Sequence, residues 1–345
     1  MKKVRWLALL IFLLLLASAG AFAAWLADDW RTPYKAAPGE VLVHVPRGTS
    51  AGQVLEALSA QGLVRSRLSL KVAYAFHGRP RNLKAGTYRF DGPLTPLQVI
   101  DKLNRGEVTY AKVTIPEGLR IEEVAEILAE NGLGRKEALL ALARRGRLVN
   151  DLDPEAHSLE GYLFPETYLF DPGLGEEAIL KALLAGFREW WQKRAPEAVA
   201  HRPVRDVVTL ASLVEKETAA PRERGDIAGV FANRLRLRMP LQTDPTIIYA
   251  QIIAGDYRGR LTRDDWTYPS PYNTYLHAGR PPGPICSPGA ASLEAALRPA
   301  PTRYLYFVSR NDGTHAFSRT LEEHNRAVAR FQRPGGGGRP RDPGR

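Results

Sequence analysis

The fold is decided by residues 204–249, which read VRDVVTLASLVEKETAAPRERGDIAGVFANRLRLRMPLQTDPTIIY. Apolar residues recur at helical spacing over 204–214, and Glu215 and Glu217 follow shortly before Pro221 must end the helix. A carboxylate at the end of a largely buried helix can have a raised pKa and act as a general acid near neutral pH. A solvated Glu-Lys-Glu end of an ordinary amphipathic helix explains the same residues, so the stretch alone leaves both interpretations open.

Two further helices are predicted after the first. Residues 226–237 place apolar side chains on one face, and Asp244 followed by Pro245 is typical of an N-cap and a first helical position. Capping alone would explain Asp244 and Pro245. Gln242 and Thr243 have no such ready structural explanation, which makes them candidates for a site.

The remaining C-terminal sequence predicts short elements around a polar and aromatic cluster. The cluster is YNTY at 272–275, and Ser287-Pro288 predicts the start of a helix that ends at Leu297. Residues 304–317 read as a hairpin across Asn-Asp-Gly, and 322–331 as a terminal helix. The Gly/Pro/Arg composition of 333–345 predicts a disordered tail.

The N-terminus predicts a membrane segment. Residues 6–27 carry no charge and are long enough to cross a bilayer as a helix. Basic residues lie within 1–5 and Asp28 and Asp29 follow, so the positive-inside rule leaves the N-terminus in the cytoplasm and exports the rest. A signal peptide cleaved near 21–23 is the alternative, but the apolar run continues past that site, which favours an uncleaved anchor.

An internal repeat follows a linker at 28–40. Residues 41–64 match 111–134 at a constant offset of 70, and each copy predicts a strand, a Pro-x-Gly turn, an amphipathic helix and a C-terminal glycine. Residues 84–90 alternate like a strand, and 95–103 read as a helix. The modules are of LysM-like size, and glycan binding and mere spacing from the membrane both remain open.

Acidic and aromatic residues are dense in 151–170, which lies between a predicted helix and connector at 135–150 and a predicted helix at 178–191. Aromatic faces suit sugar rings, but an aromatic loop more often serves simple packing. Glu166 is a third acid that could lie near a cleft containing Glu217.

Composition narrows the function classes. The 345-residue chain is 44% hydrophobic, as in globular proteins, and its net charge is +11. A basic surface suits nucleic acid, anionic lipid or an anionic cell-wall polymer. No zinc-finger spacing or RNA-binding signature favours nucleic acid. Cys286 is the only cysteine and the seven histidines are scattered, so neither a disulfide nor a metal cluster is predicted.

Seven short motifs follow one another along the chain in a fixed order: EGYLFPETY (160–168), ASLVEKET (211–218), VFANRL (230–235), LQTDPTIIY (241–249), YNTY (272–275), GRPPGPICSPG (279–289) and YLYFV (304–308). With these motifs behind an apolar N-terminal segment, the chain resembles the MltG (YceG-like) family of membrane-anchored endolytic murein transglycosylases. Cys286 and the Gly/Arg-rich tail depart from the family pattern without affecting the residues of its chemistry.

The resemblance implies cleavage of the β-1,4 bond between N-acetylmuramic acid and N-acetylglucosamine, leaving a 1,6-anhydro end. One carboxylic acid can make both proton transfers, because the muramyl C6 hydroxyl replaces water as the nucleophile. The acid must be protonated at rest, which requires an apolar pocket. No metal or nucleotide cofactor is implied. The implied partners are peptidoglycan strands and the cytoplasmic membrane, and peptidoglycan synthases of the elongation and division machinery are compatible with this role.

The helical wheel does not choose between Glu217 and Glu215, since both flank the apolar stripe equally. Glu217-Thr218 resembles the Glu-Ser pair of soluble lytic transglycosylases and goose-type lysozymes, so we take Glu217 as the acid/base and Glu215 as the second choice. The candidates for substrate binding are Glu166, Gln242, Thr243, Asp244, Tyr272, Asn273 and Tyr275.

Two other functions stay open. A hydrolysing muramidase would pair Glu217 with Glu166 or Asp244, and a reducing muramic end would identify it. A membrane-tethered peptidoglycan-binding scaffold would suit the repeated modules. Against the scaffold, a pure binding protein gives no physical reason for acids at a buried helix end.

The expected architecture is an α+β protein with one transmembrane helix, LysM-like strand–helix modules and a mixed α/β catalytic domain. The expected boundaries are a cytoplasmic stub at 1–5, the anchor at 6–27, the linker at 28–40, a LysM-like module at 41–110, the second repeat and connector at 111–154, the catalytic domain at 155–332 and the tail at 333–345.

Overall fold

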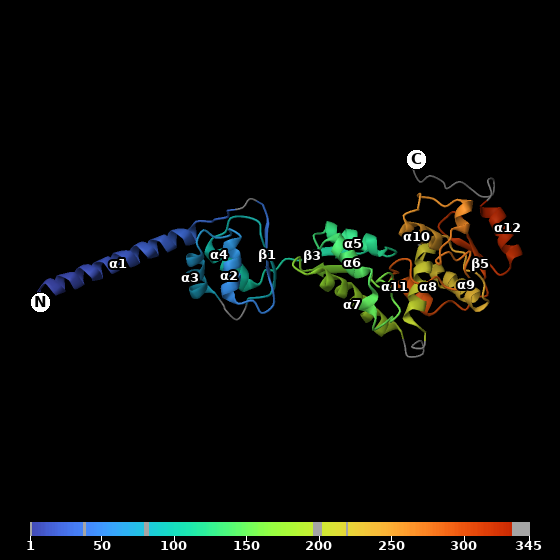
Figure 1. Ribbon diagram of the computed structural model, residues 1–345, viewed down its shortest axis with the longest axis horizontal. Helices are drawn as coiled ribbons and strands as arrows, with labels where there is room; N and C mark the ends of the chain where they lie inside the picture. Colours follow the sequence, from blue (N-terminus) through green and yellow to red (C-terminus); the bar gives the residue numbers. More distant parts are fainter. Residues whose placement is uncertain (1, 37–38, 79–82, 196–201, 219, 333–345) are drawn as a thin grey trace. The chain divides into compact units, whose positions relative to one another are not determined.

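A computed structural model describes residues 2–36, 39–78, 83–195, 202–218 and 220–332 (Figure 1). The chain forms two compact units. The first comprises residues 1–111 and 169–173, and the second 112–168 and 174–345. In the described residues the protein is mixed α/β, with many helices and three two-stranded sheets. The predicted tail at 333–345 lies outside the described residues.

The N-terminal helix α1 (Lys2–Arg31) carries an exposed apolar surface. Within it, residues 3–31 are long and apolar enough to cross a membrane. Its last turn differs from the rest, because Trp30 packs against the core of the first unit and its indole N–H donates to the carbonyl of Ser69 at 3.5 Å. One N-terminal apolar helix is therefore present, as the sequence predicts.

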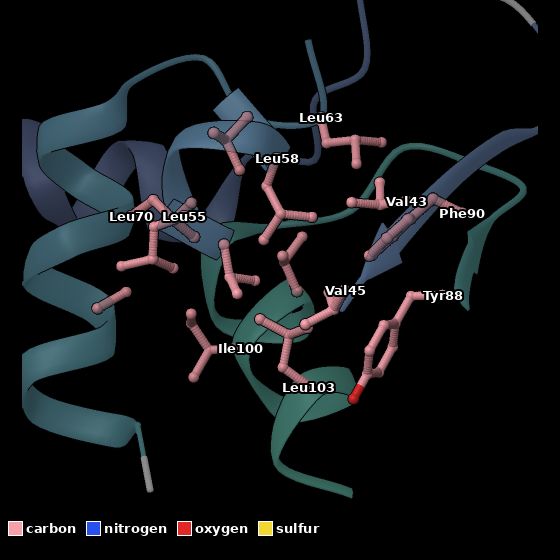
Figure 2. Packing of buried hydrophobic residues seen from close by; sticks show 14 residues of the cluster. Val43, Val45, Leu55, Leu58, Leu63, Leu70, Tyr88, Phe90, Ile100 and Leu103 are labelled. Atoms are coloured by element: carbon pink, nitrogen blue, oxygen red, sulfur yellow. The ribbon is translucent and has the colours of Figure 1, made fainter. Parts of the chain in front are cut away.

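The first unit has a small antiparallel sheet covered by helices. Strand β1 (Val41–Val45) pairs with β2 (Gly86–Phe90), and helices α2 (Ala51–Ala60), α3 (Arg67–His77) and α4 (Pro96–Arg105) pack with it. Figure 2 shows the labelled side chains of these strands and helices converging on one cluster. The core is thus built by alternate strand residues and by one apolar face of each helix.

Both copies of the repeat form the predicted strand, turn and helix. Strand β3 (Ala111–Thr114) and helix α5 (Ile121–Glu130) match β1 and α2. The turn glycines have φ of +82° and +78° and the glycines after the helices +69° and +72°, conformations that favour glycine over other residues. These glycines are Gly48, Gly118, Gly62 and Gly132. The residues of the second copy from 112 onward belong to the second unit.

Strand β3 pairs with β4 (Thr167–Phe170), and residues 112–114 and 167–168 of these strands belong to the second unit. The hydroxyls of Thr114 and Thr167 lie 2.9 Å apart, and the N–H of Ile115 donates to Glu166 O at 2.9 Å. The helices of this region are α6 (Lys136–Ala143), the 3-10 helix η1 (Gly146–Val149) and α7 (Glu176–Arg194).

Helix α8 (Val204–Glu217) is the centre of the second unit. All eight residues from 207 to 214 are buried, because α9 (Arg224–Arg236), α10 (Asp244–Ala254) and α11 (Ala290–Leu297) pack around it (Figure 1). Because α8 is buried on every side over these residues, it has no solvent-facing side there. Its acidic residues Glu215 and Glu217 lie at its C-terminal end. The remaining elements are the 3-10 helices η3 (Pro221–Glu223) and η4 (Arg263–Thr267), the hairpin β5 (Tyr306–Ser309) and β6 (His315–Ser318), and α12 (Leu321–Phe331).

The predicted helix starts at Asp244 and Ser287 are wrong by one and two to three residues. Thr243 is the N-cap of α10 without a side-chain cap bond, and Asp244 is the first helical residue. Helix α11 begins at Ala290 after Gly289, while Ser287 exchanges backbone hydrogen bonds with the second repeat near Leu119. The Asp244 carboxylate accepts the Tyr275 hydroxyl and does not cap the helix, and the backbone bonds of Ser287 keep that residue extended before the helix begins.

Candidate active site

Glu217 stands at the C-terminal end of α8, partly buried in a cleft of about 640 Å³. The negative end of a helix dipole disfavours a charged carboxylate there. Residues from several other regions of the second unit line the same cleft, among them Arg234, Gln242, Asp244, Trp266, Tyr275 and Phe307.

The carboxyl group of Glu217 is held by Thr243, whose hydroxyl donates to its Oε1. Thr243 is fixed in turn, because it is 2% exposed and its backbone N–H donates to Thr274 Oγ1 at 3.1 Å. Burial raises the pKa of Glu217 to about 7, and the charge of Asp244 adds to the rise, while the Thr243 hydrogen bond and His315 oppose it. A large share of these carboxyl groups is therefore protonated at neutral pH.

Glu215 has a different environment although it is only two residues away. Its Oε2 accepts the backbone N–H of Gly289 at 3.0 Å, and its Oε1 lies 3.5 Å from the guanidinium of Arg224. Both side chains are nearly buried, at 8% and 9% exposed, and Arg224 also donates to Ser292 Oγ at 3.0 Å. Glu215 is therefore a paired structural carboxylate that ties α8 to α9 and to the start of α11.

Asp244 and Tyr275 form one wall of the cleft. The Tyr275 hydroxyl donates to Asp244 Oδ1 at 2.7 Å, and burial followed by this carboxylate raises the pKa of Tyr275. The Tyr275 ring stacks on Trp266, with centroids 5.9 Å apart and planes 11° apart. Of the residues predicted from sequence, the structure brings Glu217, Gln242, Thr243, Asp244 and Tyr275 together.

Arg234 supports the loop before α10, and no role was predicted for it. Its guanidinium donates to the carbonyls of Pro240, Leu241 and Leu305 at 2.7–3.0 Å and lies 3.3 Å from Gln242 Oε1. Gln242 has φ of +52°, a conformation that costs a non-glycine residue free energy and needs such support. The sequence offers one signal for Arg234: it is a charged residue four positions after Val230, which places it on the same buried face of α9.

Three predicted residues lie elsewhere in the second unit. Glu166 lines a separate groove of about 480 Å³ with Phe164, Tyr168 and Trp190. Tyr272 packs against Tyr249, with ring centroids 4.9 Å apart. Asn273 is fully buried and donates to the carbonyls of Trp266 and Tyr268 at 3.1 and 2.9 Å, so it shapes the loop.

A second buried acid, Glu160, was also without a predicted role. It is 3% exposed and accepts the Tyr249 hydroxyl at 3.4 Å. Burial raises its pKa to about 8, with the nearby Glu122 charge as a further cause. Its position inside EGYLFPETY is the only signal that the sequence offers for it.

The model of the YceG-like family matches residues 43–330. The chain belongs to the YceG-like family. The family resemblance that the motifs predicted is thereby confirmed.

Curated relatives of this YceG-like chain have informative names. It is 34% identical over 308 residues to the endolytic murein transglycosylase of Bacillus subtilis (strain 168), covering 84% of each chain. The endolytic murein transglycosylase of Streptococcus pneumoniae (strain D39) is 31% identical over 352 aligned positions, which cover 93% of this chain and 64% of that longer relative. The crystal structure of a putative yceG-like protein from Listeria monocytogenes matches with a TM-score of 0.53 and 31% identity, over 84% of this chain and 98% of that one.

Proposed function

We propose that this YceG-like chain is an endolytic murein transglycosylase, which cleaves the bond between N-acetylmuramic acid and N-acetylglucosamine within glycan strands and leaves a 1,6-anhydro end. The observation that carries the proposal is Glu217, a carboxyl group with a pKa of about 7 in a cleft, hydrogen-bonded by Thr243. The names of the two relatives support the same activity.

Glu217 would make both proton transfers. In the first, its carboxyl proton passes to the glycosidic oxygen while the bond from that oxygen to C1 of the muramyl residue breaks. In the second, the muramyl C6 oxygen bonds to C1 and its proton returns to the Glu217 carboxylate. Atoms and charges balance without water, and the acid ends the cycle protonated. A pKa near 7 suits a group that must give and take a proton at neutral pH.

The neighbours of Glu217 would have separate tasks. Thr243 fixes the carboxyl orientation through its hydrogen bond to Oε1. Asp244 places a negative charge in the cleft, where it would stabilise the positive charge that develops on the sugar ring. Gln242 presents an exposed amide suited to the acetamido groups of the substrate.

A two-carboxylate muramidase is the second candidate, because Asp244 and Glu217 line the same cleft. In that reaction water attacks C1 with Asp244 as base or nucleophile. Glu166 is less suited to this task, since it lines the separate groove with Phe164 and Trp190.

Digestion of glycan strands in ¹⁸O-labelled water, followed by mass spectrometry, separates the two reactions. A transglycosylase gives anhydro ends without ¹⁸O, because the C6 hydroxyl is the nucleophile. A muramidase gives reducing ends that carry one ¹⁸O atom, and that result would overturn the proposal. Retained glycan binding without cleavage would instead favour the non-catalytic scaffold.

For the rest of the chain we propose an anchor and a substrate-presenting region. Residues 6–27 of α1 would span the cytoplasmic membrane with the N-terminus in the cytoplasm, a proposal supported by the apolar surface of this helix. The LysM-like region 41–110 would either bind glycan or only place the active site relative to the membrane, and the second repeat and connector 111–154 would join it to a catalytic domain at 155–332. Peptidoglycan synthases would supply the nascent strand.

A further inference from the structure

Trp266 is an exposed aromatic residue on the wall of the catalytic cleft. It lies in η4, its side chain is 44% exposed, and it lines the same cleft as Glu217 and Asp244. An aromatic side chain that lines a cleft beside a few polar groups is typical of ligand-binding sites.

The Trp266 ring is held in place by Tyr275. The two rings are nearly parallel, 11° apart with centroids at 5.9 Å, and the Tyr275 hydroxyl is anchored to Asp244 Oδ1 at 2.7 Å. The indole is therefore connected by direct contacts to a carboxylate that faces the proposed reaction. A rigid aromatic residue loses little conformational entropy when a ligand binds.

The backbone beneath Trp266 is fixed as well. The side chain of the fully buried Asn273 donates to the carbonyls of Trp266 and Tyr268, at 3.1 and 2.9 Å. At the other end of η4, Asp265 accepts the Thr262 N–H at 2.6 Å and the amide of Gln251 at 2.5 Å. These bonds hold η4 against α10, so the position of the indole does not depend on a free loop.

We propose that Trp266 is the stacking platform of a sugar subsite, on which one uncharged pyranose ring of the glycan strand lies beside Asp244. The proposal rests on the proposed function and adds a specificity-determining residue to it. A pyranose ring has an apolar face of C–H groups and a polar rim, which match a flat indole face and the neighbouring Asp244 and Gln242 side chains. Stacking would hold the strand in the cleft while Glu217 acts on the bond.

The test compares Trp266→Ala and Trp266→Phe with the unmutated full-length protein in detergent. We expect the KM for glycan strands to rise roughly tenfold in the Ala variant and less in the Phe variant, with kcat within about threefold, because stacking is made in both ground and transition states. Trp190→Ala is the matched control: Trp190 is a partly exposed tryptophan that lines the separate groove, and its loss should leave KM unchanged.

Thermal unfolding and direct binding complete the test. The melting temperature of Trp266→Phe should stay close to that of the unmutated protein. In the Glu217→Gln background, a hexamer of β-1,4-linked N-acetylglucosamine should change the tryptophan fluorescence, and the change should be lost in Glu217→Gln/Trp266→Phe. An unchanged KM in both Trp266 variants, or a fall in kcat alone, would overturn the platform while leaving the proposed function intact. Absence of cleavage by the unmutated protein would overturn the function, and the fluorescence change would still decide whether Trp266 contacts sugar.

Discussion

Glu215 and Glu217 are separated by one lysine, yet their carboxyl groups have different partners in this protein. Glu217 has a hydroxyl partner and no ion pair among the described residues, so burial raises the pKa of its carboxyl group to about 7. Glu215 has a guanidinium and a backbone N–H as partners. A carboxylate that is paired with a cation and a backbone N–H suits a structural role. A buried carboxyl group without a cationic partner suits proton transfer.

The activity should fall as pH rises through about 7. In the proposed mechanism Glu217 is protonated before the reaction, so kcat/KM should be constant in acid and fall about tenfold per pH unit well above the Glu217 pKa. The pH dependence of initial cleavage rates at low substrate measures this. An activity that rises through pH 7 would mean that the resting group is a base, and would contradict the account.

Stability should respond oppositely to the loss of the two carboxylates. The Glu217 pKa is raised from 4.5 to about 7, so the folded state binds the proton more tightly and stability is lost as pH rises from 4.5 to 7. Glu217→Gln removes this loss, and at pH 8 the variant should be more stable by about 1–3 kcal/mol. At pH 4 the difference should vanish.

Glu215→Gln is the matched comparison. It leaves the nearly buried Arg224 with Glu117 as its other acidic neighbour, at 3.8 Å, and should destabilise the protein by about 1–3 kcal/mol. Denaturant unfolding at both pH values checks the pair. Equal loss of stability in the two variants would contradict the assignment of their roles.

Part of this site can be predicted from the sequence, because several of the site residues lie within two short motifs. Gln242, Thr243 and Asp244 lie together in LQTDP, and Tyr275 in YNTY, and all four contact the cleft or Glu217. The choice between the two glutamates depends on partners far away in sequence, such as Thr243 and Gly289, which no helical periodicity contains.

At the scale of elements, the loop before α10 depends on α9. Arg234 binds two consecutive carbonyls of this loop, those of Pro240 and Leu241, and thereby positions Thr243 against Glu217. The periodicity of α9 predicts a helix there, but a single arginine on its buried face becomes interpretable only when its acceptors are known. The helix starts at Asp244 and Ser287 were misplaced because distant segments bind there: Tyr275 binds the Asp244 carboxylate, and the backbone near Leu119 binds the backbone of Ser287.

Arg234→Lys should weaken catalysis although the charge is kept. An ammonium cannot reproduce the planar set of donors that binds carbonyls on both sides, so the loop and Thr243 should shift. We expect kcat/KM to fall roughly 10- to 100-fold, as a misplacement near 1 Å can cause.

Arg236→Lys on the same helix is the control, because Arg236 is exposed and donates to Asn233 Oδ1 at 3.2 Å. Its activity should equal that of the unmutated protein. An Arg234→Lys variant with activity within twofold of the unmutated protein would show that the loop does not need this arginine.

At the scale of the whole molecule, α1 has two different surfaces in one helix. Most of its length presents apolar side chains to the surroundings, whereas Asp29 is 3% exposed and Trp30 packs on the first unit. Sequence hydropathy predicts the apolar helix. It does not predict that the last turn belongs to the fold of the first unit, because that packing needs the partner surface of α3 and α4.

Two truncations separate the proposed membrane anchor from the packing of the last turn. A chain that begins at Asp28 and one that begins at Pro33 should both leave the membrane fraction, which alkaline washing of membranes can measure. The chain from Pro33 lacks Trp30 and should melt at a lower temperature, by several degrees. Equal melting temperatures would mean that the last turn of α1 adds nothing to the first unit, and retention of both chains in the membrane would contradict the anchor.

The central claim is that Glu217 alone makes both proton transfers. The most direct test is mass spectrometry of glycan strands digested by the unmutated protein and by its Glu217→Gln and Glu215→Gln variants. We predict that Glu217→Gln lowers the yield of anhydro-muramic ends by at least about 100-fold, while the folded fraction of Glu215→Gln still forms them. Anhydro ends formed at an undiminished rate by Glu217→Gln would contradict the account.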